Sequence, residues 1–102
     1  MTHFDLIRQW ATDRNLIEGS TPQAQMLKTI EEIGETASAI ARKQTDLIAD
    51  GIGDVVVTLV ILAAQYGINI EDCIALAWEE IKDRKGRMVD GIFIKQEEKN
   101  GN

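Results

Sequence analysis

Two acidic clusters interrupt apolar segments of this chain, and they constrain its fold more than any other feature of the sequence. The first contains Glu31, Glu32 and Glu35, and the second contains Asp50 and Asp54. Like charges four residues apart on a helix repel by about 0.2–0.5 kcal/mol per pair. Burial of carboxylates costs more unless a positive group compensates them. A chain that places such acids beside its core therefore needs a cation, and a divalent metal ion is the natural candidate.

The spacing of apolar residues predicts an all-α domain of about four helices. The length of 102 residues allows one domain with a single modest core. Proline occurs once, and apolar residues recur at intervals of three and four. We expect the domain to cover residues 1–95 and the charged tail, residues 96–102, to be disordered. The expected helices are residues 4–14, a second from a Ser20 or Thr21 cap to about residue 41, a third from a Thr45 or Asp46 cap to Gly67, and a fourth from Asn69 to before Gly86.

Two of these helices carry apolar surface that predicts burial, and the third carries more of it than so small a chain can bury alone. In the second, one side is apolar and predicts a core face; it contains Met26, Leu27, Ile30, Ile33, Gly34, Ala37, Ile40 and Ala41. In the third, residues 55–64 are apolar on nearly every side, which indicates burial on every side. We therefore expect a homodimer or homotetramer in which the hairpins of two chains form a four-helix bundle. Alternating apolar residues after Met88 predict a short extended arm.

Charge and cysteine content exclude several classes of protein. A net charge of −6 argues against binding of a nucleic acid polymer, which needs a basic face. Cys73 is the single cysteine, so no intramolecular disulfide forms and a reducing compartment suits the chain. The first residues lack the pattern of a signal peptide, and the apolar run of residues 55–64 is shorter than a membrane span. We expect a cytoplasmic protein that does not bind membranes.

Helical geometry places the acids on neighbouring surfaces. At 100° per residue, Glu32 and Glu35 lie about 60° apart, and Asp50 and Asp54 follow each other at a spacing of four. An antiparallel pair of helices brings the two clusters face to face. Oxygen ligands of this kind suit Mg²⁺ or Mn²⁺ and not zinc. Three glycines beside the acids, Gly34, Gly51 and Gly53, would allow close helix approach or leave room for a ligand. A solvated acidic helix face remains the alternative explanation.

The acidic pattern resembles that of the MazG-like superfamily of all-α nucleoside triphosphate pyrophosphohydrolases, in particular its short single-domain forms. The family hallmark is E-E-x-x-E followed on the next helix by E-x-x-D. Glu31, Glu32 and Glu35 match the first part, and Asp54 matches the last acid of the second. Gly51 stands where the family has a glutamate, and Asp50 is the nearest substitute. The stretch of residues 80–91 also resembles the short forms, and the likeness extends over residues 4–95.

The resemblance implies Mg²⁺-dependent hydrolysis of a (d)NTP to the monophosphate and pyrophosphate. It implies that Glu32, Glu35 and Asp54 are metal ligands, with Asp50 replacing the missing glutamate. Glu31 would be a further ligand or would orient the attacking water, so that Glu31 and Glu35 are the expected catalytic carboxylates. A catalytically weak nucleotide-binding module and a helical interaction protein with a solvated acidic face are the competing hypotheses.

Several residues outside the acidic clusters are candidates for binding the substrate. The resemblance makes Lys82 and Arg84 contacts of the triphosphate, although cations at a helix end also complement the helix dipole. Lys28 reaches a phosphate or pairs with Glu32. Trp10 stacks on the base or belongs to the core. Gln25 hydrogen-bonds the substrate or is solvated.

Overall fold

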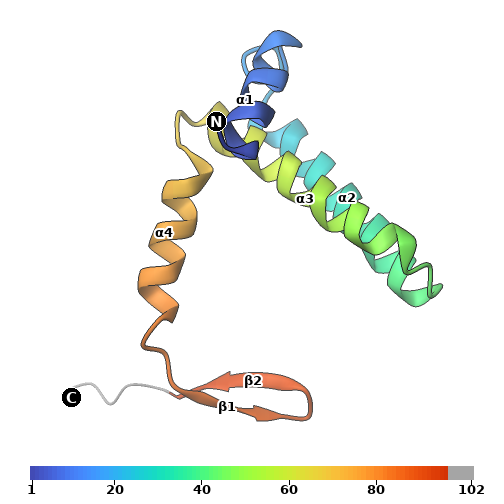
Figure 1. The fold of residues 1–102 in the computed structure, drawn as a ribbon, viewed down its shortest axis with the longest axis vertical. Coiled ribbons are helices and arrows are strands. Elements are labelled where there is room, and N and C mark those ends of the chain that lie inside the picture. Colours follow the sequence, from blue (N-terminus) through green and yellow to red (C-terminus); the bar gives the residue numbers. More distant parts are fainter. Residues whose placement is uncertain (97–102) are drawn as a thin grey trace. The chain divides into compact units, whose positions relative to one another are not determined.

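The computed structural model describes residues 1–96, and in this part of the chain it has four helices and one two-stranded sheet (Figure 1). The residues divide into two compact units, of which the first covers Met1–Ile70 and the second begins at Glu71. The first unit contains α1 (His3–Asp13), α2 (Pro22–Ala41) and α3 (Asp46–Gln65). The predicted all-α fold is therefore confirmed, and the acidic clusters both lie in the first unit.

Local sequence signals explain where the first two helices begin. Thr2 and Asp5 form a capping box at the start of α1, in which Thr2 N donates to Asp5 Oδ2 at 2.9 Å. Thr21 caps α2, because its Oγ1 accepts a hydrogen bond from Ala24 N at 3.1 Å, and Pro22 occupies the first turn. Of the two predicted caps for α2, Thr21 is therefore the one used. Thr45 makes no side-chain cap at α3, so that prediction is wrong for Thr45.

Helices α2 and α3 form a hairpin whose members lie side by side along most of their length (Figure 1). Residues 42–45 join them, and Lys43 takes a left-handed conformation with φ of 57° in this tight connection. Helix α1 packs on α3 as well. The apolar core is small and consists of Ala11, Ala39, Val60, Ile61 and Ala63.

The side of α2 that faces α3 differs from the predicted core face. The buried or half-buried positions of α2 follow spacings of three and four, and are Pro22, Gln25, Thr29, Glu32, Thr36 and Ala39. Ile30, Ile33 and Ile40 are instead 53%, 49% and 59% exposed in the single chain, so the prediction of a core face is wrong within one chain. The physical reason is that small and polar side chains allow the two helices to approach closely. A Cβ at Gly51 of α3 would collide with Thr36 Oγ1 and lie 3.2 Å from Thr36 Cβ.

The α2–α3 hairpin has two chemically different sides. Around α2, Ile33 lies about 80° to one side of Gln25, and Glu35 lies about 80° to the other side. In an antiparallel pair, rotations of the same sign on the two helices lead to the same side of the pair. We call one side the acidic face, made of Glu31, Glu32, Glu35, Asp50 and Asp54. We call the other the apolar face, made of Ile30, Ile33, Ile40, Ile52 and Val56, each at least 36% exposed.

The second unit contains a β-hairpin that the sequence analysis did not predict. Helix α4 (Ile70–Ile81) ends earlier than expected, and β1 (Gly86–Val89) pairs antiparallel with β2 (Ile92–Lys95). Asp90 and Gly91 form the two-residue turn with φ of 51° and 79°, as a type I′ hairpin requires. The predicted extended arm is thus two short strands that begin at Gly86. The predicted tail lies outside the described residues from residue 97 onward.

Helix α3 is, among the described helices, the one that is long and apolar enough to cross a membrane by length and composition, with a hydropathy of 2.1. The core helix of a soluble protein can meet the same criterion. Asp50 and Asp54 lie within this helix, and ionised side chains in the middle of a bilayer are costly. The acids favour the role of α3 as the central helix of the first unit.

Candidate metal centre

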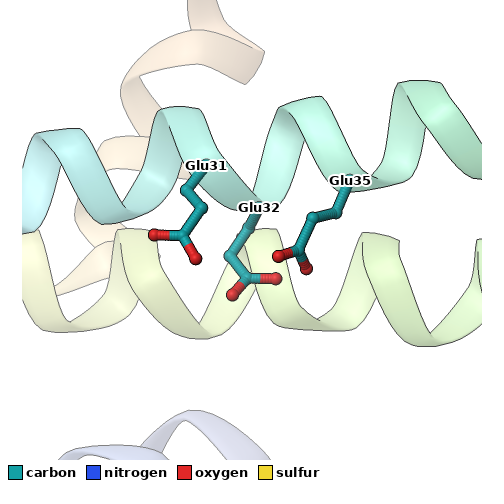
Figure 2. A group of neighbouring side chains, drawn as sticks. All are labelled: Glu31, Glu32 and Glu35. Carbon is teal, nitrogen blue, oxygen red and sulfur yellow. The ribbon is translucent and has the colours of Figure 1, made fainter.

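Three glutamates of α2 converge on one side of the helix. Glu31, Glu32 and Glu35 each have a carboxylate oxygen within 4.8 Å of the others, and Figure 2 shows the three side chains leaving α2 in the same direction. Glu35 follows Glu31 by four residues and Glu32 by three, and these spacings place its side chain beside both. The side chain of Glu32 is only 12% exposed, whereas that of Glu31 is 56% exposed. The cluster therefore extends from the α2–α3 contact outward to solvent.

The second acidic cluster reaches the same side of the hairpin from α3. Asp54 is half-buried, and burial raises the pKa of its carboxyl, with further contributions from the negative charges of Asp50 and Glu32. Glu32 and Asp54 line one cavity, so α2 and α3 bring these two acids to the same side of the hairpin. Asp50 is exposed and lies outside the group of three glutamates that could share one ion. The predicted meeting of the two clusters is thus supported for Asp54, while Asp50 lies at the margin.

Lys28 supplies positive charge to the glutamates. Its Nζ lies 3.4 Å from Glu31 Oε1 and 3.4 Å from Glu32 Oε1, and the hydrogen bond to Glu31 is the main reason that the pKa of Lys28 is raised. Of the two roles predicted for Lys28, the i,i+4 ion pair with Glu32 is therefore present in the structure. This compensation is incomplete, because the charge of Glu32 is the first cause of a raised pKa at Glu35, followed by burial.

The donor set fits a divalent cation. The cluster offers only carboxylate oxygens, which are hard ligands suited to Mg²⁺ or Mn²⁺. Repulsion between the negative charges of the acidic face contributes to the raised pKa of Glu35 and, after burial, to that of Asp54. A dication between these oxygens would remove that repulsion. Glu31, Glu32, Glu35 and Asp54 are the residues that could hold it, with Asp50 near enough to contribute charge.

A cavity of about 420 Å³ opens beside these acids, within the size range of small-molecule sites. The cavity runs along the hairpin, because two of its lining residues, Gln25 and Glu32, are seven residues apart on α2. This spacing corresponds to about 10.5 Å along the helix axis. One end has the carboxylates of Glu32 and Asp54, and the other end is mostly apolar. The lining residues are Trp10, Leu16, Gln25, Lys28, Glu32, Asp54, Val57, Thr58 and Ile61.

Three predicted substrate-binding residues line this cavity, namely Trp10, Gln25 and Lys28. Trp10 of α1 is 45% exposed, and the Arg14 guanidinium lies 4.5 Å from the centre of its ring. Gln25 is 9% exposed and its Nε2 donates to Thr58 O at 3.1 Å, so the alternative that Gln25 is merely solvated is wrong. The sequence analysis missed Leu16, Val57, Thr58 and Ile61. The last three follow Asp54 at spacings of three, four and seven, which is a signal that could have found them.

Lys82 and Arg84 lie in the second unit, just after α4. Lys82 Nζ pairs with Glu79 Oε2 at 2.6 Å, and an Arg84 guanidinium nitrogen lies 3.4 Å from Glu80 Oε1. Both side chains are therefore engaged with acids one turn earlier in the chain. These pairs leave open the predicted contact with a triphosphate.

Comparison with known proteins identifies the family that this fold and acidic site define. The family model of the MazG nucleotide pyrophosphohydrolase domain matches residues 20–89, a span that includes every residue of the acidic face. The chain belongs to this family. The predicted resemblance is thus confirmed, and with it the class of nucleotide pyrophosphohydrolase domains.

A phage protein is a close relative of this chain. The chain is 54% identical over 63 residues to the "Uncharacterized 18.2 kDa protein in rep-hol intergenic region" of Haemophilus phage HP1. The match covers 62% of this chain and 39% of the relative, so the chain spans about two fifths of the length of that curated protein. No solved structure matches the chain.

Proposed function

We propose that this protein is a Mg²⁺-dependent nucleoside triphosphate pyrophosphohydrolase that converts a (d)NTP and water into a (d)NMP and pyrophosphate. The observation that carries the proposal is the convergence of Glu31, Glu32 and Glu35 within 4.8 Å, with Glu32 and Asp54 lining a cavity of about 420 Å³. Membership of the MazG family supports the same reaction. An acidic cluster without a cavity would fit a solvated helix face equally well.

The acidic residues are proposed to have different roles, according to how far each one is buried. Glu32 and Asp54 lie deepest and are proposed as ligands of Mg²⁺, or of Mn²⁺ in its place, together with Glu35 and the marginal Asp50. A bound dication would neutralise oxygens of the triphosphate and so favour attack on phosphorus. The side chain of Glu31 is 56% exposed, and Glu31 is proposed to orient the attacking water. Glu35, whose carboxylate lies beside that of Glu31, is proposed to accept a proton from that water.

Positive side chains are proposed to bind the phosphates that the acids do not reach. Lys28 lines the cavity and is already next to Glu31 and Glu32, so a phosphate oxygen can replace a carboxylate as its partner. Lys82 and Arg84 are proposed as further phosphate contacts, which would require exchange of their pairs with Glu79 and Glu80. Exposed ion pairs contribute little stability, so this exchange costs little.

We also propose that the protein is a homodimer or homotetramer assembled through the apolar face. Five apolar side chains of this face are exposed in the single chain, namely Ile30, Ile33 and Ile40 of α2 and Ile52 and Val56 of α3. Such a surface is typical of subunit contacts. Packing the hairpins of two chains on this side would give a four-helix bundle with the acidic faces outside. The proposed setting is the cytoplasm, with neither a nucleic acid polymer nor a membrane as partner.

The test is release of pyrophosphate from a panel of natural and damaged (d)NTPs, with and without Mg²⁺. We expect Mg²⁺-dependent release that falls at least about 100-fold in Glu35→Gln and Asp54→Asn, because loss of a direct ligand should exceed the 10–100-fold effect of losing an outer partner. Asp46→Asn is the matched control, since Asp46 is an exposed acid on the same helix as Asp54. Turnover that persists in both variants or without a divalent metal would refute the proposal.

One observation favours a catalytically weak nucleotide-binding module as a second candidate. Gly51 has no carboxylate, and its contact with Thr36 leaves no space for one. Stabilisation of the protein by Mg²⁺ and nucleotide without turnover would identify this function. An unchanged melting temperature would instead indicate a helical interaction protein.

A further inference from the structure

The apolar end of the cavity contains a glutamine whose orientation is fixed by its surroundings. Gln25 is 9% exposed, and its side-chain amide lies 3.1 Å from Thr58 O. A carbonyl oxygen can only accept a hydrogen bond, so the amide nitrogen must be the atom that faces Thr58. The other end of the amide, Oε1, is therefore the free end of the group.

This oxygen is an unused acceptor beside the cavity. Within residues 1–96, no donor bonds to Gln25 Oε1, and it is not sealed from solvent as Gln65 Oε1 is. Solvent reaches so buried a residue through the cavity that it lines. Thr58 Oγ1 donates its proton to Val55 O at 2.6 Å, which leaves this hydroxyl an acceptor too. Gln25 Oε1 and the Thr58 hydroxyl are thus both able to accept a hydrogen bond at this end.

The surrounding residues suit a flat ring. Leu16, Val57 and Ile61 supply apolar surface, and the Trp10 ring also lines the cavity. The Arg14 guanidinium covers one side of Trp10 at 4.5 Å, so the opposite side is the one left for stacking. Gln25 lies about 10.5 Å along α2 from Glu32, which separates this end from the carboxylates.

We propose that Gln25 selects nucleotides whose base carries an amino group at C4 of a pyrimidine or C6 of a purine, namely cytosine and adenine. This inference rests on the proposed function of the acidic face. The amino group would donate to Gln25 Oε1. Uracil, thymine and guanine carry a carbonyl oxygen at that position, which would face two acceptors and lose its hydrogen bonds to water.

The experiment compares kcat/KM for dCTP and dATP with that for dUTP, dTTP and dGTP, in the presence of Mg²⁺. We expect the wild type to prefer the two amino-bearing substrates by at least about 10-fold, as one neutral hydrogen bond allows. Gln25→Met, which keeps the size and removes the acceptor, should lower kcat/KM for these two by about 10-fold and leave the other three within about threefold. Gln23→Met is the matched control, because Gln23 is an exposed glutamine of the same helix.

Binding of the same five nucleotides with Mg²⁺, measured by calorimetry on the wild type, separates this inference from the proposed function. Turnover without a preference for amino-bearing bases, or a preference that Gln25→Met retains, would overturn the role of Gln25 and leave the hydrolase intact. The wild-type ranking decides the question even if the variant does not fold. Binding that follows the expected ranking without turnover would support Gln25 and overturn the hydrolase. Absence of binding by all five would overturn both.

Discussion

The contact between Gly51 of α3 and Thr36 of α2 leads to a quantitative prediction for Gly51→Ala. Alanine gains about 1 kcal/mol over glycine inside a helix. The added Cβ would collide with Thr36 Oγ1 and lie 3.2 Å and 3.3 Å from Thr36 Cβ and Cγ2. Overpacking of this kind costs about 1–3 kcal/mol. We therefore expect Gly51→Ala to range from neutral to about 2 kcal/mol less stable, in contrast to the gain that propensity alone predicts.

Two variants make this prediction sharper. Gly53→Ala is the matched control on the same helix, because a Cβ there meets nothing within 4 Å, and it should stabilise the protein by about 1 kcal/mol. Thr36→Ala removes Oγ1 and Cγ2, so the double variant with Gly51→Ala should recover most of the helical gain. The interaction energy of this double-mutant cycle should be about 1–2 kcal/mol.

The assay is urea unfolding of all four variants at one protein concentration, followed by circular dichroism. The reasoning would be refuted if Gly51→Ala stabilised the protein as much as Gly53→Ala and showed no coupling to Thr36. That result would mean that α2 and α3 are further apart at this level. It would also mean that a glutamate at position 51 could be accommodated without moving the helices.

Two more predictions concern the acidic and apolar faces. The pKa values of Glu35 and Asp54 are raised in the folded state, so their repulsion is fully present above the raised values and is relieved as the pH falls through them. Melting curves should show that the metal-free protein gains stability on mild acidification. The stabilisation by Mg²⁺ should disappear over the same pH range. A Mg²⁺ effect that stays constant from about pH 7.5 to about pH 4.5 would contradict this expectation. On the apolar face, Ile33→Asp should shift sedimentation toward the monomer, whereas Ser38→Asp, an exposed position of α2 off that face, should not. A wild-type protein that sediments as a monomer would contradict the proposed assembly.

Helix positions and most of their ends were predictable, but the orientation of α2 was not. The stripe around Ile30, Ile33 and Ile40 indicates which side of the helix avoids water, and it contains no information on which element covers it. The contact with α3 instead uses Gln25 and Thr36, whose polarity argues against burial until their hydrogen bonds are known. The packing of α2 on α3 therefore decides which side of α2 is buried, and the local sequence pattern does not.

The candidate site also has one part that the sequence predicts and another that depends on packing. Glu31, Glu32, Glu35 and Asp54 were identified from spacing, since a helix brings positions three and four apart onto one side. The apolar half of the cavity depends on how α1 and the segment after it pack on the hairpin, and Leu16 has no local signal that would reveal its place there. In the second unit, the dipeptide of residues 90–91 is a strong hairpin signal that the analysis overlooked.

The opposite placement of the acidic and apolar faces has a consequence for the evolution of this protein. A substitution on one side of the two helices meets the other side through the backbone and through buried contacts between α2 and α3 such as Gly51–Thr36 and Gln25–Thr58. The proposed subunit contact and the proposed metal site therefore use different residues, so that either can change without a substitution in the other. Two independent surfaces on 40 helical residues, 20 in each of α2 and α3, let a very short polypeptide explore both properties separately.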